Sequence, residues 1–178
     1  MAKQTGKKFK MPNPLFGKGA YEKLATLAVN EYRKITFDVN NPTMANKKKF
    51  PKYKSKSYEK RKESNQLNRQ DGSYAQSTAP VVSGDLMLDT KGDYSAKDNS
   101  IYIGWNAHAN KIDWLRDNGR ILTSKQYPIN PDVVKKMMPQ LNKELKKSMP
   151  KGTNTITIGK KKKIFFIKYF QLYYSEVL

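Results

Sequence analysis

The chain has 178 residues, no cysteine and a formal net charge of +20. This length suits one domain with extensions, and the lack of cysteine excludes disulfide bonds and thiolate metal sites. Hydrophobic residues make up only 37%, so part of the chain is expected to lie outside any core. No apolar run is long enough for a bilayer span and no apolar segment follows the first basic residues, so we predict no membrane association and no secretory signal.

The positive charge is concentrated at the two ends. Residues 1–70 carry a net charge of +13, residues 71–134 carry −2, and residues 135–178 carry +9. The middle is therefore an ordinary mixed-charge segment, whereas the ends suit nucleic acid or an acidic protein surface. We predict a basic N-terminal arm over 1–18, an α+β domain over 19–150 with an extended arm at about 40–80, and a C-terminal β-hairpin extension over 151–178.

Apolar residues at three- and four-residue steps predict a helix over 19–35. The members of this stripe are Tyr21, Leu24, Ala28, Tyr32 and Ile35. Asn40-Asn41-Pro42 ends the pattern. Residues 45–80 then contain few apolar anchors, although Ser55 is placed to cap a short helix that runs to Glu63. We therefore expect this arm to gain contacts from a neighbouring molecule.

From Val81 the pattern changes to β. Leu86 and Leu88 alternate with Met87 and Asp89, a loop with Gly92 turns the chain, and a return strand ends near Trp105, so a hairpin is predicted over 84–105. A short helix over 107–118 follows, and Gly119 is placed to end it.

The C-terminal part begins with a helix signal, because Asn130 can cap a helix whose first residue is Pro131. The predicted helix over 131–148 has an apolar stripe made by Val134, Met138, Leu141 and Leu145. Residues 153–174 alternate around a lysine turn and predict a second hairpin. The predicted fold class is α+β, with a small antiparallel sheet of two hairpins packed against an N-terminal and a C-terminal helix, and with long basic arms.

Catalytic chemistry has little support in the sequence. His108 is the only histidine and has no cysteine nearby, so a structural or surface role is favoured over metal binding. The carboxylates of the middle segment fall in predicted turns and short helices, where turn and cap roles account for them. We predict no catalytic residue, no metal site, no cofactor and no enzymatic activity.

The stretch from Lys160 to Tyr174 interleaves lysines with aromatic residues and allows two interpretations. The aromatic rings suit base stacking beside a phosphate-binding groove. However, they occur in adjacent pairs, which is typical of a strand buried on both faces, and this second interpretation is favoured. The turn residues Lys160, Lys161, Lys162 and Lys163 remain candidates for contacts with a DNA backbone under either interpretation.

The order of several short motifs resembles a known family. A Phe-Pro-x-Tyr segment at Phe50 comes first, followed by Val82-Ser83-Gly84-Asp85-Leu86-Met87, by a strand that ends in Ile103-Gly104, and by a short helix that ends in Gly119-Arg120. A Pro-led helix closes the series. This order, over about residues 45–148, is similar to that of the virion-morphogenesis (tail-completion and neck) proteins of tailed bacteriophages, with Ser83 at a position that is usually threonine.

The resemblance implies a structural protein of the virion, assembled in the host bacterial cytoplasm. Its protomers would form a homo-oligomeric ring at the head–tail junction as a neck, tail-completion or tail-terminator protein through which DNA passes. The implied partners are portal or connector and tail proteins, with genomic DNA contacted through its phosphates. The candidates for subunit contacts are Tyr53, Tyr58, Val82, Gly84, Leu86, Phe165 and Phe170.

Two other functions remain open from the sequence. The first is a stand-alone basic nucleic-acid-binding protein that uses the Lys160–Tyr174 stretch. The second, which is less favoured because there is no acidic or histidine cluster, is a small nuclease.

Overall fold

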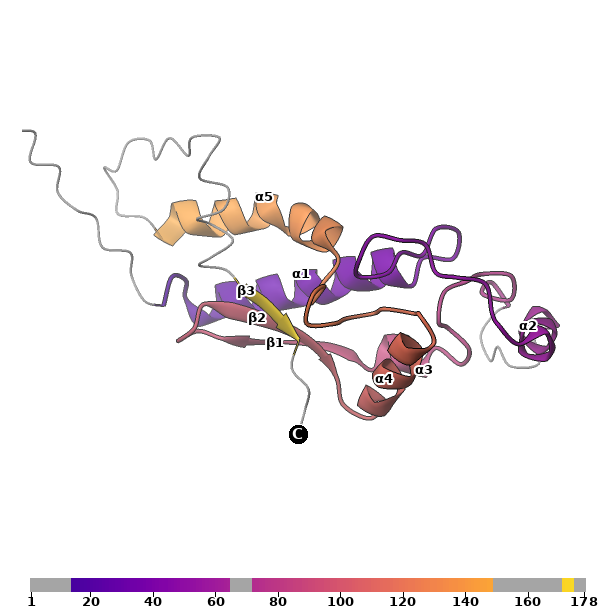
Figure 1. Ribbon diagram of the computed structural model, residues 1–178. Coiled ribbons are helices and arrows are strands. Elements are labelled where there is room, and N and C mark those ends of the chain that lie inside the picture. The colour runs from indigo at the N-terminus through magenta and orange to yellow at the C-terminus, as the bar shows by residue number, and fades with distance from the viewer. Residues whose placement is uncertain (1–13, 65–71, 149–170, 175–178) are drawn as a thin grey trace, which may run out of the picture.

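The computed structural model describes residues 14–64, 72–148 and 171–174 (Figure 1). Its elements, in chain order, are the helices and strands α1 (Lys18–Thr36), α2 (Lys56–Glu63), α3 (Asp85–Leu88), β1 (Thr90–Ser95), β2 (Ser100–Trp105), α4 (Ala109–Asp117), α5 (Pro131–Ser148) and β3 (Gln171–Tyr174). The α+β fold class predicted from the sequence, with a small sheet and flanking N- and C-terminal helices, is confirmed. Residues 1–13 of the basic N-terminal arm predicted over 1–18 lie outside the described residues, whereas its Leu15 and Phe16 are buried in the core. Of the C-terminal extension predicted over 151–178, only 171–174 is described.

Helix α1 lies at the centre of the fold, with α5 along one side and the sheet along the other (Figure 1). It buries more of its circumference than the predicted stripe, since Ala25, Val29 and Thr36 are buried together with four of the predicted residues. Ile35 is only partly buried. A helix that contacts partners on two sides needs a wide apolar face, and the small alanine side chains let both partners approach closely.

Helix α5 has the bounds predicted from the sequence, and the predicted Leu141 and Leu145 are buried. In its first half the buried residues are Val133 and Met137, whereas the predicted Val134 and Met138 are only partly buried. Asn130 anchors the start of this helix. Its side chain is fully buried, accepts a hydrogen bond from the Asp132 amide at 2.9 Å and donates one to the Met44 carbonyl at 2.9 Å. The cap is thus attached to the core and fixes the helix orientation.

The predicted hairpin over 84–105 is only partly correct. Strand β2 is where the sequence places it, and β1 pairs with it in antiparallel register, with Gly92 opposite Ile103. However, Leu86 and Leu88 lie in α3, and the first strand begins at Thr90. The backbone of this segment bonds locally, because the Leu88 amide donates to the Gly84 carbonyl at 2.9 Å, so it cannot join the ladder.

The third strand joins the sheet with a polarity that the sequence analysis did not predict. β3 pairs with β2 in parallel, from Ser100 opposite Gln171 to Ile103 opposite Tyr174, which gives the order β1-β2-β3. The sheet is therefore mixed rather than purely antiparallel. The rest of the predicted second hairpin over 153–174 lies outside the described residues.

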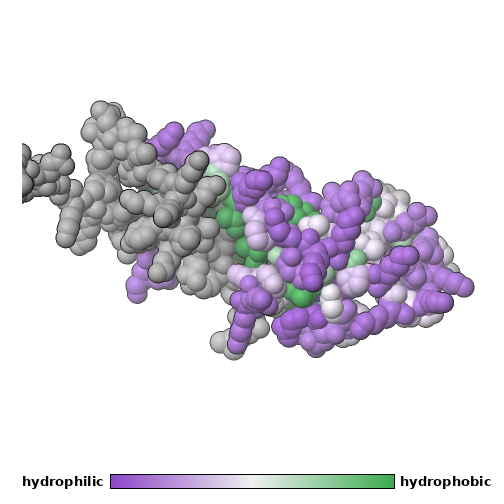
Figure 2. Space-filling view, turned by 45° about the horizontal axis from the view of Figure 1, so that its top comes forward, coloured by the Kyte–Doolittle hydropathy of each residue, from purple (hydrophilic) through white to green (hydrophobic). Residues whose placement is uncertain are grey.

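The fold places the short helices α2, α3 and α4 away from the α1–α5 pair. Figure 1 shows α4 and α3 at one end of the sheet and α2 farther out, at the extremity of the described chain. The corresponding end of the molecule is almost entirely hydrophilic on the face shown in Figure 2, where hydrophobic residues appear in small patches between hydrophilic side chains. The region between α2 and α4 contains the candidate site.

Candidate functional site

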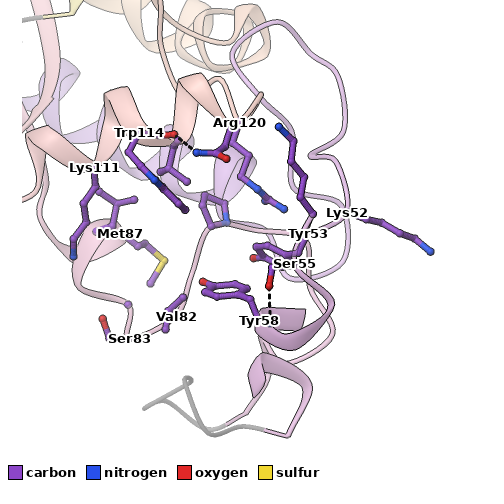
Figure 3. Close-up of a pocket in the computed structure, with 16 residues that line it drawn as sticks. Lys52, Tyr53, Ser55, Tyr58, Val82, Ser83, Met87, Lys111, Trp114 and Arg120 are labelled. Atoms are coloured by element: carbon purple, nitrogen blue, oxygen red, sulfur yellow. Dashed lines mark hydrogen bonds between the residues drawn. The ribbon is translucent and has the colours of Figure 1, made fainter. Parts of the chain in front are cut away.

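A groove of about 530 Å³ lies between the segment that leads into α2 and the α3–α4 region (Figure 3). In Figure 3, Lys111 and Trp114 of α4 stand on one side, Tyr53, Ser55 and Tyr58 stand on the other, and Val82 and Met87 lie between them. Of the 16 residues that line the groove, four are basic and none is acidic. Its volume lies in the usual range for binding pockets.

The groove brings together candidates that the sequence places in separate motifs. Five of the seven residues predicted to make subunit contacts line it, namely Tyr53, Tyr58, Val82, Gly84 and Leu86. Gly84 is the N-cap of α3, and this position directs Leu86 toward the core. The other two, Phe165 and Phe170, and the four DNA candidates Lys160–Lys163 lie outside the described residues. The contact role of all these residues stays a prediction.

Arg120 forms the inner end of the groove, and the C-terminus of α4 positions it. Gly119 has φ 76°, a conformation that glycine adopts without strain. This allows the Gly119 amide to donate to the Arg116 carbonyl at 2.8 Å and the Arg120 amide to donate to the Leu115 carbonyl at 2.8 Å, which is the Schellman pattern. The chain therefore reverses direction immediately before Arg120, and the guanidinium turns inward.

The buried Arg120 guanidinium holds two segments of the chain together. It donates to the Pro51 carbonyl and to the Thr78 carbonyl, each at 2.7 Å. Its central carbon lies 4.0 Å from the centre of the Tyr53 ring and 5.8 Å from that of Phe50. Because a guanidinium presents donors in a planar fork, one side chain satisfies both carbonyls while stacking on the ring.

A second cation, Lys62 of α2, is buried behind Tyr53. Its ammonium donates to the Tyr53 hydroxyl at 2.8 Å and to the carbonyls of Ser77 and Ala79 at 2.7 and 2.9 Å. Burial, together with the nearby positive charge of Arg120, lowers the pKa of Lys62 to about 8. Within the described part of the chain, neither Lys62 nor Arg120 forms an ion pair with a carboxylate.

The two tyrosines form the wall opposite α4. Their ring centres are 4.9 Å apart, and the Tyr53 hydroxyl donates to the Ala79 carbonyl at 3.0 Å. Burial raises the pKa of Tyr53 to about 12, against the opposing effect of Arg120. Burial likewise raises the pKa of Tyr58. Both phenols are therefore neutral at physiological pH, and the positive charge of this site is not balanced by a phenolate.

These contacts attach the predicted arm at about 40–80 to the rest of the domain. Phe50, Ala79 and Val81 are buried in the core cluster, and the Lys62 and Arg120 bonds tie α2 to the same body. In the described ranges 40–64 and 72–80, the arm is thus held on its own domain at both ends. Its exposed part is the groove wall and α2.

The opening of the groove carries an exposed aromatic residue. Trp114 is 62% exposed, which is unusual for tryptophan, whereas Trp105 is buried in the core. Lys111 lies one helical turn before Trp114, and the exposed Lys52 and Lys54 lie near the tyrosine wall. In Figure 3, Lys52 points away from the cavity. An exposed tryptophan beside lysines is a surface suited to a partner rather than to core packing.

His108 has the structural surroundings favoured by the sequence analysis. Its Nδ1 lies 3.7 Å from the Asp89 carboxylate, which accepts hydrogen bonds from the Asn106 and His108 amides at 3.0 Å each. Asp89 thus fixes the turn before α4. The described residues contain no group of three or more His, Cys, Asp or Glu side chains that could hold a metal ion. None of the helices in the described ranges has the length and hydropathy needed to cross a bilayer.

Sequence reasoning missed the pair of buried cations. Lys62 lies in a Lys- and Arg-rich run that resembles a solvated surface, and no local signal distinguishes it from Lys60. Arg120 offered one signal, since it follows a helix-ending glycine and is therefore placed at a fixed turn. Comparison with known proteins adds no further information: no protein-family model, no curated protein and no solved structure matches this chain.

Proposed function

We propose that this chain is a structural virion protein of a tailed bacteriophage, which forms a ring at the head–tail junction as a neck, tail-completion or tail-terminator protein. The observation that carries the proposal is that five predicted contact candidates, from two motifs separate in sequence, line one groove beside an exposed tryptophan. Residues from three separate segments make this surface, and contact surfaces of assembling proteins are enriched in such aromatic and arginine residues.

The sheet supports association as well. β1 lies at one edge of the three-stranded order, and three of its six residues are exposed. Its outer row of backbone groups is therefore available for pairing with a neighbouring chain. Repeated head-to-tail contacts of this kind close into a ring when the rotation between protomers permits.

The charge distribution is consistent with a protein that surrounds DNA. A formal net charge of +20 favours phosphate contacts that do not read sequence. The same charge supports the second candidate, a stand-alone nucleic-acid-binding protein. These two functions differ in stoichiometry, because a stand-alone binder acts as a free monomer, whereas a junction protein assembles.

Sedimentation of the purified full-length chain over a range of concentrations and salt tests the proposal. We expect a closed oligomer of one defined size that persists when salt is raised, because its contacts are partly apolar. A monomer at all concentrations that binds DNA with a steep salt dependence supports the stand-alone binder and contradicts the ring.

A further inference from the structure

We propose that the groove between α2 and α4 binds an acidic segment of a partner polypeptide, with one large apolar side chain seated against Trp114 and flanking carboxylates at the basic rim. The inference rests on the proposed function in that it names the chemistry of a partner at this assembly surface. It is carried by the charge and the shape of the groove itself.

The first observation is the uncompensated positive charge. The groove is lined by four basic residues and no acidic one, and the buried Lys62 lies directly behind Tyr53. Asp113 and Asp117 of α4 pair with Arg116, and Asp85 of α3 accepts a hydrogen bond from Ser83. Glu59 and Glu63 of α2 do not line the groove, although the Glu59 carboxylate acts electrostatically on Tyr53. A partner that brings carboxylates supplies the missing complement to the rim.

The second observation is the apolar interior. Between the charged rims lie Val82, Met87 and the exposed Trp114, facing the tyrosine rings (Figure 3). A methionine and a tryptophan offer polarizable, adaptable contact to an inserted apolar side chain. A pocket of about 530 Å³ accommodates one such side chain together with the adjoining backbone.

These features favour an acidic polypeptide over nucleic acid. A nucleic-acid strand requires a continuous track of phosphate contacts beside its stacked bases. Here the basic groups are separated by an apolar floor, and Lys52 points outward (Figure 3).

The test is selection of random linear peptides on the full-length chain, followed by titration of the enriched peptides with intrinsic fluorescence as the readout. Because Trp105 is buried, a change on binding reports mainly on Trp114. We expect enriched peptides that contain an aromatic or large aliphatic residue flanked by aspartate or glutamate. Binding should weaken as salt is raised.

Three variants define the site. Lys111→Glu reverses an exposed rim charge and should weaken binding about tenfold, and Trp114→Ala should abolish both binding and the fluorescence change. Lys125→Glu makes the same charge change at an exposed lysine that does not line the groove, and it should leave binding nearly unchanged. All three positions are on the surface, so folding is expected to be retained.

The proposal is overturned if no peptide is enriched, if enriched peptides lack acidic residues, if Lys111→Glu and Lys125→Glu behave alike, or if a single-stranded oligonucleotide rather than a peptide changes the Trp114 fluorescence. Sedimentation of the same preparation separates this outcome from the ring. Peptide binding by a strictly monomeric chain supports the proposed binding site and contradicts ring assembly. A ring that binds no peptide supports ring assembly and contradicts the proposed binding site.

Discussion

The guanidinium of Arg120 stacks on the ring of Tyr53, with its central carbon 4.0 Å from the ring centre. The hydroxyl of the same tyrosine accepts a hydrogen bond from Lys62. Two buried cations therefore contact one phenol, and their other hydrogen bonds go to carbonyl groups rather than to carboxylates. This arrangement holds the wall of the groove in place, and no carboxylate of the described residues neutralises either cation by an ion pair.

The planar, multidentate guanidinium of Arg120 should contribute more to stability than its positive charge does. In Arg120→Lys the positive charge is kept, but one of the Pro51 and Thr78 carbonyls loses its donor and the stacking on Tyr53 is lost. We expect the free energy of unfolding to fall by about 1–3 kcal/mol. Urea denaturation measures it. The matched control is Arg116→Lys on the exposed side of α4, expected to change stability by less than about 0.5 kcal/mol; equal effects of the two changes would contradict the assigned role.

Lys62 predicts an unusual dependence of stability on pH. Its pKa is lowered from 10.5 to about 8 in the folded chain, so between these values the unfolded chain binds more protons than the folded chain. Stability should therefore rise with pH above 8, by up to about 3 kcal/mol. Above about pH 10 a second group opposes this rise. The pKa of Tyr53 is raised from 10.0 to about 12, so in that range the folded chain binds more protons than the unfolded chain and stability falls with pH.

Urea denaturation of the original chain and of Lys62→Met at several pH values between 8 and 10 measures this effect. The variant should be less stable at the upper end of the range, because the Ser77 and Ala79 carbonyls lose their donor. The stability of the variant should also show no rise with pH over this range. A rise of the same size in both proteins would show that another group is responsible.

Gly92 of β1 packs closely against α1. A Cβ atom at this position would lie 2.7 Å from the Ala25 carbonyl oxygen and 2.9 Å from a Val29 methyl carbon. Gly92→Ala should therefore lower the free energy of unfolding by about 1–3 kcal/mol, because backbone cannot move aside cheaply. In the control, Gly19→Ala in the first turn of α1, the added atom meets nothing within 4 Å. Thermal denaturation should show that this change is neutral or stabilising by up to about 1 kcal/mol.

Exposed apolar residues inside and outside the groove should differ in their effect on assembly. Trp114 and Leu88 are 62% and 61% exposed, but only Trp114 lines the groove. Trp114→Ser should leave thermal stability nearly unchanged and reduce the yield of complete particles in a complementation assay. Leu88→Ser should leave both unchanged. An equal loss of yield with both variants would mean that the groove has no special part in assembly.

The two long helices were predictable because their apolar periodicity is sustained over several turns. The prediction for α5 was wrong only in its first half, where Val133 and Met137 are buried instead of Val134 and Met138. The start of this helix is anchored by the bond from Asn130 to Met44, a contact distant in sequence that no local pattern indicates. The short helix α2 was predictable from its cap, and Ser55 does accept a hydrogen bond from the Tyr58 amide at 3.3 Å. Local signals thus fixed where helices begin and end, and tertiary contacts set their rotation.

The error at α3 and β1 has a different cause. Leu86 and Leu88 alternate with Met87 and Asp89, which was interpreted as a strand, yet the local bonds after Gly84 make a helical turn. The observed strand β1 shows no alternation of apolar and polar residues, and three of its six residues are exposed. Its glycine, Gly92, is required by the close packing against α1. From the sequence, the residues of the groove were predictable only as separate motifs. The burial of Lys62 and Arg120 was not predictable, because it depends on how the loop at Ser77 folds over α2.

Electron cryo-microscopy of tailed particles, purified from cells that carry the coding gene in its native genome, tests the central claim most directly. The account predicts density for this fold in a closed ring around the particle axis at the head–tail junction, with the groove between α2 and α4 occupied by a neighbouring polypeptide. Absence of this protein from the particle, or its location in the capsid lattice or the tail fibres, would contradict the account.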